Sequence, residues 1–318
     1  MREKTLQRYN MAPLITLTVI VISLIFPQFI SGYAWHIALV LIILLGIPHG
    51  ATDHLIFLQL SRPLTGTKNL DYFYPYYLLL MALYGLVWWL SPTFAFGIFL
   101  TISVYHFGQS NWAEIIFPDK ISAALTYLCW GSFVLFLPIL WHFAAAAPII
   151  GIITGKAVPS LAPGWSTTIC LTLLTLNVWL VFYWWTKGVL TVRLLQRELM
   201  NLLTLSALFF STPLLLGFAI YFVVWHSLGS ANDQIHFFKT RRSAYSWKHY
   251  LRQTLPLSVV AIAGLGFLYW LKTLLGLQPH IGILFIFISV ITLPHMILMD
   301  QLYDEWQHSG ELSDTPHI

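Results

Sequence analysis

Segments of about twenty mainly apolar residues recur along the whole chain, and they leave little choice of fold. A helix needs roughly 20 such residues to cross the hydrocarbon core of a bilayer. We therefore predict an all-α, polytopic transmembrane helix bundle, a single integral-membrane domain over 1–318. About ten spans are expected, at 12–30, 34–58, 72–91, 93–114, 121–142, 165–186, 196–212, 214–238, 253–275 and 281–302.

The seventh predicted span, 196–212, is short and begins in the charged pair Arg197-Glu198, so whether it crosses fully is left open. Composition supports the membrane class for the chain as a whole. Only 9% of residues are charged and 58% are hydrophobic, whereas about a quarter of an average soluble domain is charged. A soluble globular protein, a disordered chain and a nucleic-acid binder are therefore excluded.

The basic residues predict an orientation. With the N-terminus inside and the spans alternating, fourteen of the sixteen Lys and Arg residues fall on the inner side, and Lys156 and Lys272 fall outside. Cytoplasmic loops carry such an excess of basic residues. We expect both termini in the cytoplasm and a bacterial-type cytoplasmic membrane. The outer loops are expected to be short, at 31–33, 91–92 and 276–280, apart from a longer one over roughly 143–164.

Four of the twelve histidines stand out because they lie inside predicted spans that run in the same direction, from outside to inside. His49, His106, His226 and His295 each fall 12 to 15 residues after the expected start of a span. At helical rise this is roughly 18–23 Å from the outer edge. A single histidine could simply bind a neighbouring carbonyl, but four at one depth favour a metal site in the bundle core.

Carboxylates accompany these histidines. Asp53, Asp233 and Asp300 follow their histidines by four, seven and five residues, and the first two offsets favour a shared helix face. They are expected to accept hydrogen bonds from imidazole N–H groups or to form a polar network beneath the metal. They could instead lie at the inner interface. His54 is a further candidate ligand or supporting residue. An all-nitrogen site without thiolates suits iron, copper or zinc.

Short motifs around the four histidines resemble those of the Brp/Blh family of membrane β-carotene 15,15'-dioxygenases. The resemblance runs over most of the chain, in motif order and spacing. The blocks are 46–50 (GIPHG, followed by Asp53-His54), 105–108 (YHFG), 221–227 (ending in WHS) and 293–295 (LPH). It implies cleavage of the central double bond of β-carotene by O₂ at a non-haem Fe(2+) centre, giving two molecules of all-trans-retinal for a microbial rhodopsin.

The same resemblance implies that His49, His106 and His226 are iron ligands. The family's fourth ligand falls four residues after the third, where this chain has Ser230. Serine is a poor neutral ligand for iron. The centre is therefore expected to keep three histidines, or to recruit His295, His54 or a water held by Ser230, and the substrate could differ.

Other functions remain open at this point. They are another histidine-ligated membrane metalloenzyme with a lipophilic substrate, a transporter or proton channel lined by His and Asp, and a bis-histidine haem protein. The clustered histidine boxes of membrane desaturases are absent from the sequence. A retinal-binding opsin is disfavoured because Lys272, near the end of a span, is the only lysine within one.

Overall fold

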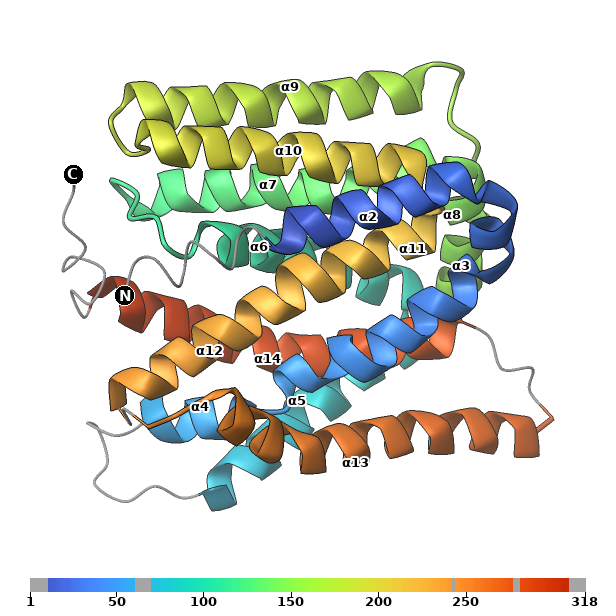
Figure 1. The fold of residues 1–318 in the computed structure, drawn as a ribbon. Helices are drawn as coiled ribbons and strands as arrows, with labels where there is room; N and C mark the ends of the chain where they lie inside the picture. The colour runs from blue at the N-terminus through green and yellow to red at the C-terminus, as the bar shows by residue number, and fades with distance from the viewer. Residues whose placement is uncertain (1–10, 61–69, 242–243, 277–280, 309–318) are drawn as a thin grey trace. The chain divides into compact units, whose positions relative to one another are not determined.

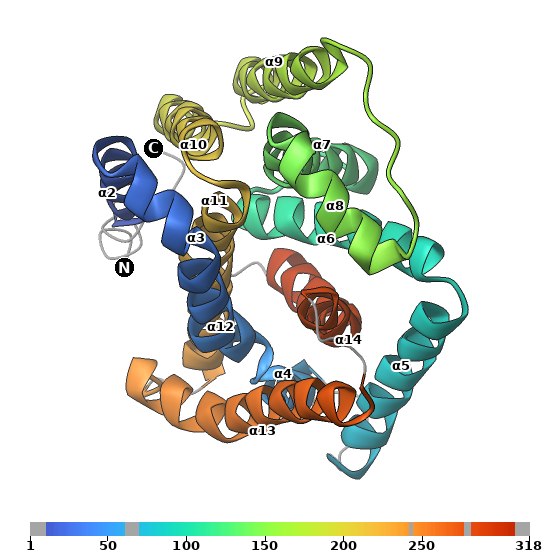
Figure 2. The same cartoon turned by 90° about the vertical axis from the view of Figure 1, so that its right-hand side faces the viewer.

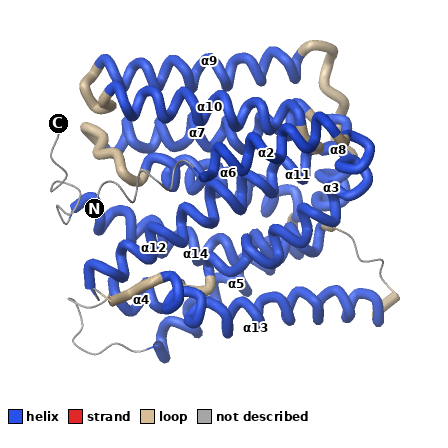
Figure 3. The backbone as a smooth tube through the Cα atoms, in the orientation of Figure 1, coloured by secondary structure: helices blue, strands red, loops and turns tan. Residues whose placement is uncertain are grey.

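A computed structural model describes residues 11–60, 70–241, 244–276 and 281–308. Throughout these residues the chain forms helices joined by loops, with no strand (Figure 3). The helices, drawn in Figure 1, are α2 (Met11–Ile25), α3 (Pro27–Leu41), α4 (Asp53–Leu60), α5 (Leu70–Leu90), α6 (Pro92–Trp112), α7 (Lys120–Trp141), α8 (Phe143–Thr154), α9 (Trp165–Thr186), α10 (Val192–Ser211), α11 (Leu214–Ile220), α12 (Leu228–Arg241), α13 (Trp247–Leu274) and α14 (Gly282–His308).

Three irregular helical segments interrupt this series. Two are π-helical, η1 (Ile42–Gly46) and η3 (Tyr221–Ser227), and one is a 3₁₀ turn, η2 (Ile47–Gly50). Isolated π-helical turns inside α-helices are frequent at functional sites. η2 contains His49 and η3 contains His226, both predicted site histidines, and η1 directly precedes η2.

The all-helical prediction is confirmed, and the predicted spans lie mainly in helices, although 12–30 contains the break between α2 and α3 and 34–58 runs from α3 through η1 and η2 into α4. Among the described residues, seven helical stretches are long and apolar enough to cross a bilayer: Pro27–Leu60, Leu70–Leu90, Lys120–Trp141, Trp165–Thr186, Leu214–Thr240, Trp247–Leu274 and Gly282–Trp306. The chain is therefore compatible with a multi-pass membrane protein. The number of spans and their orientation stay predictions.

Two loop predictions were wrong. Residues 31–33 lie inside α3, and the chain instead breaks at Phe26, just before the helix begins at Pro27. Proline favours the first helical position because its missing N–H has no intrahelical partner there. The expected outer loop over 143–164 contains α8 in its first part, with Pro148 inside the helix. Most of the predicted loop at 276–280 lies outside the described residues.

The chain divides into two compact units, each built from three segments. Unit 1 comprises residues Met1–Gly46, Ser103–Ala147 and Pro159–Gly229, and unit 2 comprises Ile47–Ile102, Pro148–Val158 and Ser230–Ile318. The single integral-membrane domain expected from the sequence stays a prediction.

In unit 1, α9 packs on α7, while α10 packs on α2, α7 and α9, so that α7, α9 and α10 lie side by side (Figure 1). In unit 2, α14 packs against α4, α5 and α13 (Figure 2).

Two glycines bring α6 and α7 into backbone contact within unit 1. A Cβ atom on Gly108 would lie 1.9 Å from the carbonyl oxygen of Tyr127, and one on Gly131 would lie 1.7 Å from that of Val104. Small residues allow membrane helices to approach this closely. Because Gly108 lies two residues after His106, this contact fixes the height and rotation of the helix that carries that histidine.

A polar network in unit 1 surrounds the charged beginning of α10. Glu198 is fully buried and accepts hydrogen bonds from Arg197 Nε (2.7 Å), Asn111 (3.2 Å) and Asn201 (3.2 Å). Arg197 also pairs with Glu114 at 3.1 Å. Because the carboxylate accepts three hydrogen bonds, one of them from a guanidinium, the charge that weakened this segment as a predicted span can be accommodated inside the protein.

Candidate metal-binding histidines

Unit 1 brings together two of the four predicted histidines. His106, on α6, and His226, in η3, are both buried, with ring centroids 4.9 Å apart and ring planes at 80°. They are 120 residues apart in sequence, so the pair depends on the packing of the helices that carry them. Two imidazoles at this separation can contribute nitrogen ligands to a common metal ion.

Aromatic rings surround His226. Phe107 contacts the imidazole edge-on, with centroids 4.8 Å apart, and Phe222 stacks on it at 5.7 Å with an interplanar angle of 21°. Phe218 stacks in turn on Phe222. These rings fix the orientation of the imidazole and keep its surroundings apolar, which strengthens electrostatic interactions there.

The two π-helical segments pack against each other in unit 1. Gly46, the last residue of η1, faces Phe222 of η3, and a Cβ on Gly46 would lie 2.6 Å from the Phe222 ring. Glycine is therefore required for Phe222 to occupy the position from which it stacks on His226.

Unit 2 brings together the other two predicted histidines. His49, in the 3₁₀ turn η2, and His295, on α14, have ring centroids 4.9 Å apart and perpendicular rings, at 88°. Gly50 lies directly beside His295, because a Cβ there would be 3.6 Å from its Nδ1. The GIPHG block thus supplies one histidine and a stretch of backbone that lies beside the other.

A buried carboxylate holds His295. The Nδ1 atom of His295 lies 2.8 Å from Asp53 Oδ1, and Tyr77 of α5 donates to Asp53 Oδ2 at 2.8 Å. An ionised carboxylate can only accept, so Nδ1 carries the proton and Nε2 has the lone pair that a metal requires. The sequence spacing favoured a histidine on the same helix as the partner of Asp53. The structure instead provides one from α14, because His49 lies in the 3₁₀ turn η2, outside the helix α4 that begins at Asp53.

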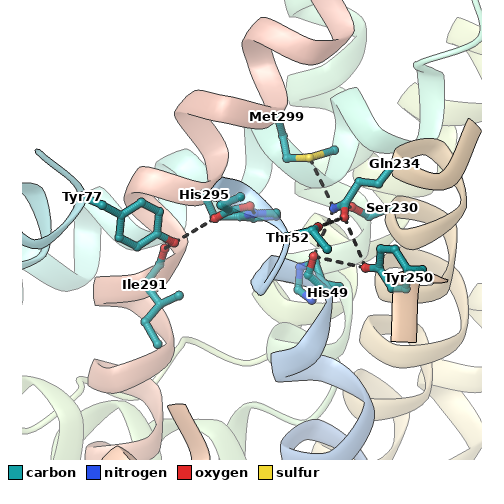
Figure 4. A network of polar contacts seen from close by, with 10 residues as sticks. His49, Thr52, Tyr77, Ser230, Gln234, Tyr250, Ile291, His295 and Met299 are labelled. Atoms are coloured by element: carbon teal, nitrogen blue, oxygen red, sulfur yellow. Dashed lines mark hydrogen bonds and ion pairs between the residues drawn. The ribbon is translucent and has the colours of Figure 1, made fainter. Parts of the chain in front are cut away.

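A second polar network in unit 2 surrounds the fully buried amide of Gln234 (Figure 4). Gln234 Nε2 donates to the carbonyl oxygen of His49 at 3.1 Å and to Ser230 Oγ at 3.2 Å. The hydroxyls of Thr52 and Tyr250 donate to Gln234 Oε1. Ser230, the residue at the family's fourth ligand position, is thus a hydrogen-bond acceptor in this network.

The remaining predicted residues lie elsewhere in unit 2. His54 faces α5, with its ring 6.5 Å from those of Phe73 and Tyr74. Asp233 accepts a hydrogen bond from Tyr303 at 3.1 Å, which links α12 to α14. Asp300 is half-buried on α14, five residues after His295.

The nitrogen donors of these histidines are suitable ligands for iron. Imidazole nitrogen is a usual ligand for iron, and a metal-bound histidine commonly donates its other N–H to a carboxylate, as His295 does to Asp53. Within the described ranges, no three His, Cys, Asp or Glu side chains are gathered closely enough to hold a metal ion as they stand. The structure therefore provides histidines in pairs, each pair defined within its own unit.

Four residues of these networks were not predicted from the sequence: Thr52, Tyr77, Gln234 and Tyr250. Gln234 carried a usable signal, because an amide inside an apolar span needs partners. Tyr250 lies in the first turn of α13, before the predicted start of that span. Tyr77 lies in a run of aromatic residues of the kind that also forms interfacial belts, so its sequence context did not distinguish it.

Comparison with known proteins gives one consistent result. The sequence model of the family "Beta-carotene 15,15'-dioxygenase" matches residues 40–303. A protein of that name from the uncultured marine bacterium 66A03 is 27% identical over 278 residues, which cover 84% of this chain and 93% of that protein. No solved structure matches the chain. The match begins just before η1 and ends on α14, and so includes all four histidines. The chain therefore belongs to the β-carotene 15,15'-dioxygenase family of carotenoid-cleaving enzymes.

Proposed function

We propose that this enzyme cleaves β-carotene at its central 15,15' double bond with O₂, at a ferrous centre inside the membrane, and releases two molecules of all-trans-retinal. The observation that carries the proposal is the pair His49–His295, in which a buried carboxylate leaves the Nε2 lone pair of His295 for a metal. The reaction balances without a further reductant, because each oxygen atom of O₂ ends in one of the two aldehydes.

The ligands are proposed to come from the two histidine pairs. His106 and His226 are both buried and pack edge-to-face, and His49 and His295 pack in the same way. These histidines would hold a ferrous ion, which when bound would supply the activation of O₂ for attack on the polyene. With Ser230 engaged by Gln234, His295 is the histidine best placed to replace the family's fourth ligand.

The protein's own part is to orient groups and exclude water. Asp53 keeps the proton of His295 on Nδ1, and Tyr77 keeps the carboxylate in place. Phe107 and Phe222 enclose His226 on two sides. Flat apolar walls of this kind suit a conjugated hydrocarbon and keep competing water away from a reactive centre.

A membrane location fits such a substrate. β-carotene is soluble in lipid, and helices such as α13 expose apolar side chains along their length, including Leu255, Val260 and Phe267. We propose that the substrate enters from the bilayer, that the chain lies in a bacterial cytoplasmic membrane with its N-terminus inside, and that the retinal passes to a rhodopsin.

The test uses the full chain purified in detergent. Iron content is measured by mass spectrometry, and retinal formation from β-carotene in mixed micelles is measured by chromatography. We expect about one iron per chain, loss of retinal formation on chelation, and recovery with Fe(II). His226→Ala and His295→Ala should lose iron and activity, whereas the exposed His36→Ala should keep both. Retinal formation by iron-free protein would refute the ferrous centre.

A further inference from the structure

The side chain of Gln234 has a single possible orientation, because one of its neighbours can only accept. The carbonyl oxygen of His49 lies 3.1 Å from Nε2 and has no proton to give. The amide nitrogen must therefore face it, and Oε1 faces the hydroxyls of Thr52 and Tyr250. With Ser230 Oγ as the second acceptor for Nε2, all four hydrogen-bonding positions of the amide are occupied.

This arrangement is costly to disturb. Gln234, Thr52 and Ser230 are all fully buried. Leaving a buried donor or acceptor without a partner costs about 1–3 kcal/mol in soluble proteins, and in a membrane interior there is no bulk water to replace the lost contact. The amide therefore holds its four neighbours in fixed relative positions.

The contact that matters for the site is the one to the main chain of His49. The turn η2 is a 3₁₀ segment of four residues that contains Pro48, which has no backbone N–H to donate. Such a turn is held less firmly than a regular helix. Gln234, whose Nε2 lies 3.1 Å from the His49 carbonyl oxygen, attaches the turn to α12, and Tyr250 links the same amide to α13 by donating to its Oε1.

We propose that Gln234 is a positioning residue for His49. It fixes the main chain of the 3₁₀ turn, and so sets the direction in which the imidazole of His49 presents its nitrogen to the metal. By the same contacts, the hydroxyl of Ser230 serves as an acceptor for Gln234 and is not an iron ligand. This inference rests on the proposed function in one respect: it takes His49 to be a ligand.

Two matched comparisons test the role of the clamp formed by Gln234, Thr52 and Tyr250. Gln234→Met keeps the length of the side chain and removes its hydrogen bonds. Tyr250→Phe removes one clamp hydroxyl, and Tyr84→Phe is its control, since Tyr84 is equally buried in unit 2 and donates to the Ala95 carbonyl at 2.9 Å. Thr52→Val removes the other clamp hydroxyl, whereas Thr52→Ser retains it.

Three quantities are measured for each variant: the Fe(II) dissociation constant by competition with a chromogenic chelator, the electron paramagnetic resonance spectrum of the nitric oxide adduct, and the melting temperature of the metal-free protein. We expect Gln234→Met to weaken Fe(II) binding about tenfold or more, as is usual for residues that orient metal ligands. Tyr250→Phe and Thr52→Val should weaken it less and alter the nitrosyl spectrum. Tyr84→Phe and Thr52→Ser should leave affinity and spectrum unchanged.

The outcomes separate the two proposals. If the wild-type chain binds no iron, the ferrous centre fails. If it binds iron but Tyr250→Phe and Thr52→Val match their controls in affinity and spectrum, the positioning role is refuted, even if Gln234→Met does not fold. For Ser230→Ala we expect one iron per chain at saturating Fe(II), with affinity in the range of Tyr250→Phe. Loss of iron at saturation would instead make Ser230 a ligand.

Discussion

His295 donates its Nδ1 proton to Asp53 across the contact between α14 and α4, over 2.8 Å, with both side chains buried. The two residues are 242 positions apart in the chain. This hydrogen bond determines which imidazole nitrogen of His295 can bind a metal, and it makes Asp53 the first residue to test outside the histidines.

Replacing Asp53 should weaken iron binding without removing a ligand. Asp53→Asn can still accept from His295 through its amide oxygen but loses the negative charge, so we expect the Fe(II) dissociation constant to rise about tenfold. Tyr77→Phe removes only the support of the carboxylate and should have a smaller effect in the same direction. The measurement is chelator competition on purified protein. Wild-type affinity in Asp53→Asn would show that this carboxylate does not act on the metal site.

Gly108→Ala should separate α6 from α7. The added methyl group would lie 1.9 Å from the backbone carbonyl oxygen of Tyr127, which cannot swing aside as a side chain could. We expect a loss of stability of about 1–3 kcal/mol or more, together with reduced iron binding, because His106 would shift with its helix. Gly97→Ala is the control, since on the same helix no atom lies within 4 Å of its Cβ position. Thermal unfolding in detergent measures the stability of both variants, and equal melting temperatures would contradict the backbone contact.

Gly46 and Phe222 should be energetically coupled. Gly46→Ala forces the Phe222 ring away, since its Cβ would come within 2.6 Å of that ring, and the ring stacks on His226. Phe222→Leu alone removes the stacking but leaves space. In the double variant the smaller side chain accommodates the methyl group, so a double-mutant cycle on kcat/KM should give a coupling of about 0.5–3 kcal/mol. Strictly additive effects would show that the two residues act independently.

Arg197→Met should destabilise unit 1 strongly. It leaves the fully buried Glu198 without its cation and removes the pair with Glu114. Removing one partner of a buried ion pair typically costs about 3–5 kcal/mol. Adding Glu198→Gln removes the uncompensated charge and keeps an amide for Asn111 and Asn201, so the double variant should recover part of the loss. Chemical denaturation of the wild type, Arg197→Met and the double variant measures their stabilities. A double variant less stable than Arg197→Met would overturn the expected order.

The helices could be predicted from the sequence because hydropathy is a local property. Most expected spans fell on one helical stretch, even 196–212, although its charged beginning argued against it. Packing supplies the explanation that the pattern lacked, because Glu198 finds three hydrogen-bond donors. The wrong loop at 31–33 has a similar origin. Ser31 and Gly32 are permissive residues within a helix, whereas Pro27 marks the break.

The candidate site could be predicted only in part. Polar residues in apolar spans identified the histidines, and the structure groups them as His106 with His226 and His49 with His295. Which histidines form a pair depends on how the helices rotate and pack, and sequence spacing alone does not predict this. The same limit applies to Asp53, because its spacing from His49 favoured a partner on the same helix. It applies also to Tyr250, whose partner Gln234 lies on another helix.

The π-helical segment η3 has a consequence for how this chain can vary. A π-turn holds one residue more than an α-turn, so deleting a single residue from Tyr221–Ser227 could restore a regular helix with no loss of apolar length. The residues beyond the deletion would then keep their rotation about the helix axis, whereas the same deletion in a regular α-helix would turn each of them by about 100°, the angle that one residue occupies. Such a protein would keep its hydropathy profile and lose the π-turn that carries His226. Membrane insertion and function therefore respond differently to the same one-residue change, and hydropathy alone would not reveal the loss.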